Sequence, residues 1–168
     1  RNRLLHSRNI KNIQMKNFLN PGPIEVIMDY THTENNDESF NSLGIVILGI
    51  QPKPITASKN CISQDPANHR VTMLEAARET VQWVERTLDR HLTRDIHFVF
   101  PDRWITDLIN CKSRRANRDF AIRKRQHETF NIIDRFTTDH HRLNIKFGKV
   151  NKSYSWFKVA TEQAKKGS

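Results

Sequence analysis

Cysteine is scarce in this sequence of 168 residues, and long apolar runs are missing. The two cysteines, Cys61 and Cys111, form neither a CxxC pair nor a cluster with histidine, which excludes a zinc framework of cysteine ligands. So few cysteines suit a reducing compartment, and they leave one disulfide open. Because no run of about 18 or more apolar residues occurs, we expect no membrane span. The expected location is intracellular, in the cytoplasm or the nucleus.

Several signatures of catalysis and metal binding are also missing. The eight histidines include no H-x-x-x-H pair, and His140-His141 falls in an expected turn. Neither a Ser/His/Asp nor a Cys/His arrangement has support from its local sequence, and no glycine-rich phosphate loop is present. We therefore expect no metal held by histidine and no cofactor.

Positive charge is plentiful. The chain has 28 lysines and arginines against 18 acidic residues, a net charge of +10 and a pI near 10.0. Such a balance favours a polyanionic partner, with nucleic acid as the leading candidate and an acidic protein as the alternative. The length and the hydrophobic fraction of 36% fit a single domain with its own core.

The N-terminal part differs from the rest of the chain. Residues 1–22 mix basic and apolar residues, and Pro21-Gly22-Pro23 ends this segment because proline cannot continue a helix. The sequence begins with Arg1, which favours a fragment of a longer chain. We expect residues 1–22 to be a basic arm or linker from a preceding region and residues 23–168 to form the domain.

The order of apolar and polar residues predicts five strands and four helices. We expect strands at 23–30, 43–50, 55–63, 96–100 and 143–150, and helices at 71–91, 102–111, 115–138 and 156–166. The first three strands have short connections and form an antiparallel meander. The last two follow helices and add in parallel. The expected fold is therefore α/β, with a mixed five-stranded sheet and flanking helices.

Asp29 closes the first strand after the mostly apolar stretch from Ile24 to Met28, in which Glu25 is the only charged residue. A buried strand that delivers an acid to its C-terminal rim is a common way to build a site in an α/β fold. The alternative is that Asp29 only starts the turn, since aspartate hydrogen-bonds its own backbone there.

The order of elements and several short motifs resemble the ribonuclease H family over residues 24–166. The motifs are an aspartate at the end of the first strand (Asp29), a glycine in the second (Gly44), and an Asn-x-Arg entry to the long helix, here Asn68-His69-Arg70. The resemblance implies a ribonuclease H-like fold. It also implies four catalytic carboxylates that hold two Mg²⁺ ions.

Only Asp29 keeps its carboxylate among the four positions that the resemblance implies. The other three are Thr72, Pro101 and Thr161, and the loop histidine is replaced by Asn151. A hydroxyl is a poor substitute for a carboxylate on Mg²⁺, and proline has no ligand atom in its side chain. The resemblance therefore implies a degenerate, catalytically inactive centre that holds no metal.

Neighbouring acids offer an alternative, an active Mg²⁺-dependent ribonuclease H that uses Asp29, Glu75 and Asp102. A shift of one residue, however, turns a strand side chain to the other face of the sheet and rotates a helical one by about 100°. We expect Glu75 and Glu162 to be surface acids, and Asp102 to lie in the first turn of its helix, where the helix dipole favours it.

A dense basic segment lies between the fourth and fifth strands. Its members are Lys112, Arg114, Arg115, Arg118, Arg123, Lys124 and Arg125. The spacing of Arg114, Arg118 and Arg125 predicts that they share one helical face. Such a face could contact phosphates with little reading of base sequence, or it could simply be solvated. In the resemblance, the segment corresponds to a basic substrate-handling region.

These features together indicate a catalytically inactive ribonuclease H-like domain that acts as a nucleic-acid-binding or protein-interaction module. The resemblance suggests a retroelement origin, in which a preceding reverse transcriptase domain or another protein is a further partner. A second alternative is a protein-binding pseudoenzyme whose basic charge meets an acidic partner.

Overall fold

The computed structural model describes residues 22–32, 41–61, 68–88, 92–111 and 116–166. The proposed N-terminal arm and three members of the basic segment, Lys112, Arg114 and Arg115, lie outside these ranges. The strands are β1 (Ile24–His32), β2 (Asn41–Leu48), β3 (Ile55–Cys61), β4 (Ile96–Phe100) and β5 (Ile145–Lys149). The helices are α2 (His69–Thr87), α3 (Arg103–Asn110), α4 (Phe120–Asp139) and α5 (Ser155–Lys166).

The five strands form one mixed sheet in the order β3-β2-β1-β4-β5. β2 pairs with β1 and with β3 in antiparallel fashion, and Asp29 lies opposite Gly44. β4 pairs in parallel with β1 and with β5, and the last β1–β4 pair is Ile27 with Val99. The predicted meander with two parallel additions is confirmed.

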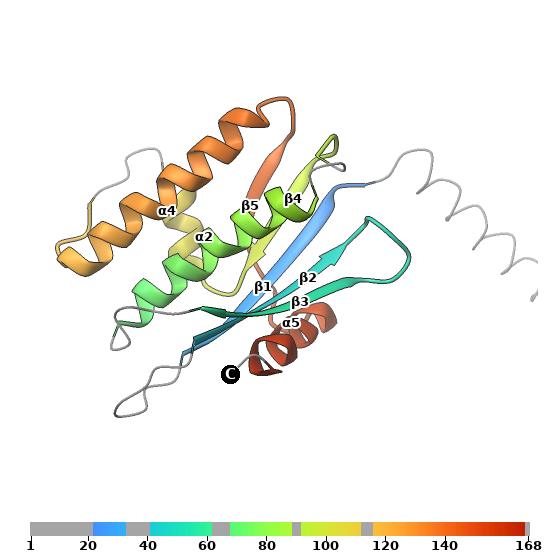
Figure 1. Ribbon diagram of the computed structural model, residues 1–168, viewed down its shortest axis with the longest axis horizontal. Coiled ribbons are helices and arrows are strands. Elements are labelled where there is room, and N and C mark those ends of the chain that lie inside the picture. Colours follow the sequence, from blue (N-terminus) through green and yellow to red (C-terminus); the bar gives the residue numbers. More distant parts are fainter. Residues whose placement is uncertain (1–21, 33–40, 62–67, 89–91, 112–115, 167–168) are drawn as a thin grey trace, which may run out of the picture.

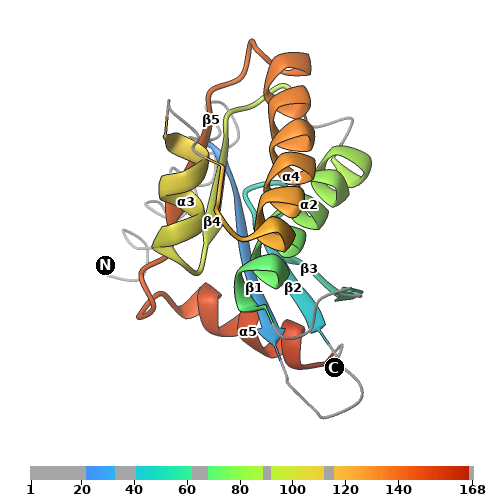
Figure 2. The same cartoon turned by 90° about the vertical axis from the view of Figure 1, so that its left-hand side faces the viewer.

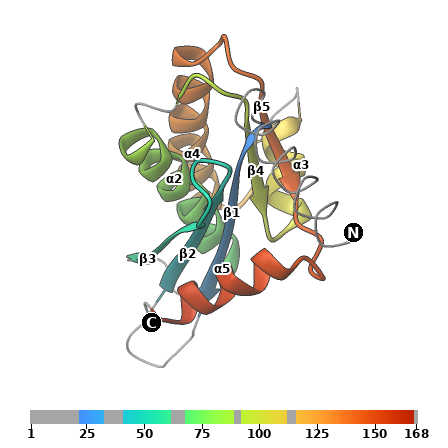
Figure 3. The same cartoon turned by 90° about the vertical axis from the view of Figure 1, so that its right-hand side faces the viewer.

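Helices cover both faces of this sheet (Figure 1). α2 and α4 pack against each other on one face, while α5 crosses β1 and β2 on the other, as Figures 2 and 3 show from the sides. α3 packs against β5 and β4. The two layers follow from the alternation of side chains along β1, because successive residues point to opposite faces.

Apolar side chains of β1 fill both layers. Val26 and Met28 join the large core beneath α2 and α4, whereas Ile27 joins a smaller cluster with Val46 and Ala160 beneath α5. By the same alternation, Asp29 belongs to the α5 face and Tyr30 to the α2 face.

Gly44 allows α5 to lie close to β2. A Cβ at this position would lie 2.1 Å from the Ala160 carbonyl oxygen and 2.4 Å from the Ala164 nitrogen. Any side chain here would therefore collide with the backbone of α5. The glycine that contributes to the family resemblance thus has a packing reason in this chain.

Several predicted boundaries are wrong, and two of them concern Asp29 and the basic segment. β1 continues to His32, so Asp29 lies inside the strand rather than at its end, because β2 keeps pairing with β1 as far as Asn41. α4 begins at Phe120 rather than near residue 115, because the Asp119 side chain accepts the amide hydrogens of Ala121 and Ile122 and caps the helix there.

Two further expectations concern cysteine and the membrane. Cys111 is exposed just after α3. Within the described ranges, no helix combines the length and the apolar character that crossing a bilayer requires.

Candidate functional site

Asp29 lies where β1 separates from β4, two residues beyond the last pair between these strands. Its carboxylate turns toward α5, where the Thr161 hydroxyl donates a hydrogen bond of 2.7 Å to Oδ2. The same hydroxyl lies 3.0 Å from the Phe157 carbonyl oxygen. Thr161 therefore stands beside Asp29, at the place where the family resemblance implies another carboxylate.

Burial dominates the electrostatics of Asp29. Loss of water raises the pKa of its carboxyl group above the usual value, and the Thr161 hydrogen bond and the charges of Lys152 and Lys165 offset this only in part. The site thus disfavours the ionised form of the one acid that it contains. A binding site for a divalent cation, in contrast, needs several ionised oxygens.

Thr72, on α2, is buried and belongs to a hydrogen-bond network. The side-chain amide of Asn41 donates to its hydroxyl oxygen at 3.2 Å, and His32 Nδ1 lies 2.9 Å from the same atom. The hydroxyl therefore connects α2 to the C-terminal end of β1 and to the N-terminal end of β2. This is a structural role.

Tyr30 and His69 form a contact that the sequence pattern did not predict. The Tyr30 hydroxyl lies 3.0 Å from His69 Nε2, and the His69 ring packs edge-on against His32. Burial, followed by the charges of Asp102 and Asp29, raises the pKa of Tyr30. Burial lowers the pKa of His69. The alternation of Tyr30 and His32 along β1 was the available signal, because it places both on the α2 face.

Asp102 caps α3, as its expected position at the start of that helix suggested. Its Oδ1 accepts the Trp104 amide hydrogen at 2.6 Å. The carboxylate thus satisfies a backbone donor at the helix N-terminus, where the dipole also stabilises it. Pro101, immediately before it, offers no side-chain ligand.

Glu75 is not the surface acid that we expected. It is only 4% exposed, and its Oε1 lies 3.0 Å from Nε of Arg125 on α4. The expectation failed because this face of α2 packs against α4. The alternative catalytic set is not assembled, since Glu75 turns to α4 on one face of the sheet and Asp29 to α5 on the other.

Glu162 is exposed, as expected. The side chain of Asn151, at the position of the family's loop histidine, accepts the Ser153 amide hydrogen at 3.1 Å and so shapes a turn. In the part of the chain that the structure describes, no group of three or more histidine, cysteine, aspartate or glutamate side chains could hold a metal ion. The residues present therefore do not fit a Mg²⁺ pair.

The described members of the basic segment are exposed except for Arg125, which is partly buried. Arg118, Arg123 and Lys124 are exposed. Arg125 instead turns inward, where it pairs with Glu75 and with Glu128. The predicted shared helical face of Arg118 and Arg125 is wrong, because Arg118 precedes the first turn of α4.

The backbone of this chain is similar to those of known proteins. No family model and no curated protein matches the sequence, but solved structures do. Ribonuclease H1 LC11, isolated from compost by a metagenomic approach, is 12% identical with a TM-score of 0.60 over 87% of this chain and 95% of its own. Ribonuclease H1 from Halobacterium salinarum is 9% identical with a TM-score of 0.59, over 87% and 97%.

A viral protease–reverse transcriptase contains a similar domain. The prototype foamy virus protease–reverse transcriptase is 9% identical with a TM-score of 0.55, and the match covers 86% of this chain and 20% of the viral one. At such low identity the likeness concerns the backbone, and the shared order of strands and helices carries it. This chain therefore has the ribonuclease H fold, which its sequence motifs implied.

Proposed function

We propose that this domain binds nucleic acid without hydrolysing it, as a ribonuclease H-like module whose catalytic centre has degenerated. The observation that carries the proposal is the 2.7 Å hydrogen bond between Asp29 and Thr161. A threonine hydroxyl takes the place of a carboxylate beside the one remaining acid. One carboxylate with a raised pKa cannot balance the charge of two divalent ions.

Charge supports the binding part of the proposal. The net charge of +10 favours a polyanion, and Arg118, Arg123 and Lys124 are exposed around the start of α4. Among the structural neighbours, LC11 ribonuclease H1 has also been solved in complex with an RNA/DNA hybrid, at 12% identity and a TM-score of 0.57. Nucleic acid is therefore a partner that suits both the fold and the charge.

The foamy virus neighbour supports the proposed origin. There a domain of this fold is part of a protease–reverse transcriptase chain. We propose that the present domain also derives from a retroelement and follows, or once followed, a reverse transcriptase region. Co-expression with such a region would reveal a stable complex if the two still associate.

A salt titration tests the binding proposal. The logarithm of the binding constant for an RNA–DNA hybrid should fall linearly with the logarithm of salt concentration, with a slope of roughly −0.7 to −0.9 for each phosphate contacted. Replacing Arg118, Arg123 and Lys124 together by alanine should weaken binding and make this slope shallower. The matched control replaces the exposed Lys53, Lys146 and Lys158, which removes the same charge elsewhere.

Equal loss of affinity in the two triple variants would reduce the interface to diffuse charge and contradict the proposed location. Absence of nucleic-acid binding at low salt would refute the proposal altogether. That result, combined with capture of an acidic protein, would favour the alternative of a protein-binding pseudoenzyme.

A further inference from the structure

Phe120 is the most exposed large hydrophobic side chain in the described ranges. It is 69% exposed, whereas the next, Tyr154, is 36% exposed. Phe120 is the first residue of α4, and Asp119 already caps that helix, so the ring is not needed to start it. When a partner covers an exposed phenyl ring, apolar surface is removed from water and the free energy falls.

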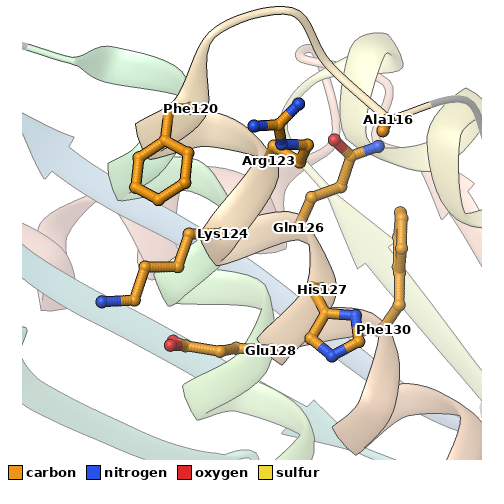
Figure 4. Close-up of a pocket in the computed structure, with 8 residues that line it drawn as sticks. All are labelled: Ala116, Phe120, Arg123, Lys124, Gln126, His127, Glu128 and Phe130. Carbon is orange, nitrogen blue, oxygen red and sulfur yellow. The ribbon is translucent and has the colours of Figure 1, made fainter.

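A hollow lies beside this ring. It has a volume of about 660 Å³, and its wall comes from Ala116 and from α4 between Phe120 and Phe130. Figure 4 shows the Phe120 ring standing out from the helix near Lys124, with Phe130 at the opposite end of the wall. The volume falls in the range of roughly 300–1,000 Å³ that is usual for small-molecule sites.

Cations surround the exposed ring. The Arg123 guanidinium lies 5.5 Å from the centre of the Phe120 ring, within range of a cation–π contact. Lys124 is exposed on the next turn, and His127 also lines the hollow. The apolar ring suits a flat ligand that can stack on it, and the cations beside the ring suit a ligand with negative charge.

The two acids nearby are already engaged. Asp119 accepts the backbone hydrogens of Ala121 and Ile122, and the Glu128 carboxylate pairs with Arg125 at 2.8 Å and with Arg78 at 3.2 Å. The Glu128 charge is therefore compensated within the protein, and the Asp119 side chain is held at the cap of α4. The cations at the rim of the hollow are left to attract an anionic ligand.

We infer that Phe120 is a stacking platform for an unpaired base of single-stranded nucleic acid, with Arg123 and Lys124 contacting the adjoining phosphates. The inference rests on the proposed function. Every base has a π face, so stacking on an aromatic side chain tolerates any sequence, while cations beside it follow the backbone. A duplex hides its base faces and can use only the cations. An apolar peptide would leave the cations unmatched.

The test compares Phe120→Ala with wild type on a single-stranded DNA of about 12 nucleotides and on the same sequence as a duplex. Affinity for the single strand should fall by roughly 5- to 150-fold, the usual range for loss of one stacked base, and affinity for the duplex should not change. Phe120→Trp should retain single-strand affinity. Tyr154→Ala removes the other exposed ring and should change neither.

A 2-aminopurine base in the single strand provides a direct signal, because stacking on an aromatic ring quenches its emission. The quenching should appear with wild type and Phe120→Trp and should be lost with Phe120→Ala. Unchanged single-strand affinity in Phe120→Ala would overturn the inference while the proposed binding function stands. If wild type binds the RNA–DNA hybrid but not the single strand, the inference alone fails; if it binds none of the three, the inference and the proposed function fail together.

Discussion

The Thr161 hydroxyl and the Asp29 carboxylate lie 2.7 Å apart and join α5 to β1. Gly44, opposite Asp29 on β2, allows this because its missing side chain admits the backbone of α5. The packing that would bring two carboxylates together in a metal site here brings one carboxylate and one alcohol together. In the proposed function, this pair keeps the scaffold of such a site and loses its charge.

Substitution of Asp29 by asparagine should stabilise the domain at neutral pH. Burial raises the folded-state pKa of Asp29 above its usual value of 3.8, so the folded state binds the proton more tightly than the unfolded state. Stability is therefore lost as pH rises from 3.8 through the folded pKa, and the loss persists at neutral pH. Asparagine avoids that loss and can still accept the Thr161 hydrogen bond.

Urea denaturation at about pH 7 and at about pH 4 measures this effect. The advantage of Asp29→Asn over wild type should be present at the higher pH and should shrink at the lower one. Asp139→Asn, at an exposed position, serves as the control and should show no such difference. An advantage of the same size at both pH values would rule out the half-buried carboxylate of Asp29 as its cause.

Arg125 should matter for folding and not as a phosphate contact. Arg125→Ala removes the partner of the buried Glu75 carboxylate, which should cost about 3–5 kcal/mol of unfolding free energy. The exposed neighbour Arg123→Ala should change stability by less than about 0.5 kcal/mol. Chemical denaturation of both variants measures the difference.

A double variant separates loss of a charge partner from loss of packing. Glu75→Leu combined with Arg125→Met replaces the ion pair by apolar side chains, and it should recover much of the stability lost in Arg125→Ala. If the double variant is no more stable than Arg125→Ala, the cost arises from something other than an uncompensated buried charge.

Gly44→Ala should destabilise the domain by roughly 1–3 kcal/mol or more, because the new methyl group meets the backbone of α5 rather than a flexible side chain. The thermal unfolding midpoint should fall accordingly. Gly148→Ala is the matched control on β5, where nothing lies within 4 Å of the added carbon, and it should leave the midpoint unchanged or slightly raised. Equal shifts in both variants would show that α5 is not held close by Gly44.

The fold could be predicted from the sequence because buried side chains recur at the period of their helix or strand. The apolar run in β1 and the seven-residue spacing of Leu74, Val81 and Leu88 both point to buried faces, and all three side chains of the helix are buried. The order of elements then restricts the sheet topology, since crossover connections place later strands parallel to earlier ones. The ends of the helices and strands were predicted less well, because a single capping residue such as Asp119 decides where a helix begins.

The site was only partly predictable. The position of Thr161 beside Asp29 followed from the family resemblance, not from any local pattern. Glu75 was misread because a charged residue on a helix usually indicates solvent, and its partner Arg125 lies 50 residues later on another helix. Two residues so distant in the sequence form no recognisable spacing pattern, and only the packing of α2 on α4 reveals the ion pair.

Hydrolysis of an RNA–DNA hybrid is the most direct test of the central claim. Wild-type protein and Asp29→Asn would be incubated with the labelled hybrid in Mg²⁺ and, separately, in Mn²⁺, and the products resolved by gel. We predict that neither protein cleaves the hybrid above the level without protein. Cleavage by wild type that disappears in Asp29→Asn would contradict the account, because it would mean that Asp29 still works with a metal ion.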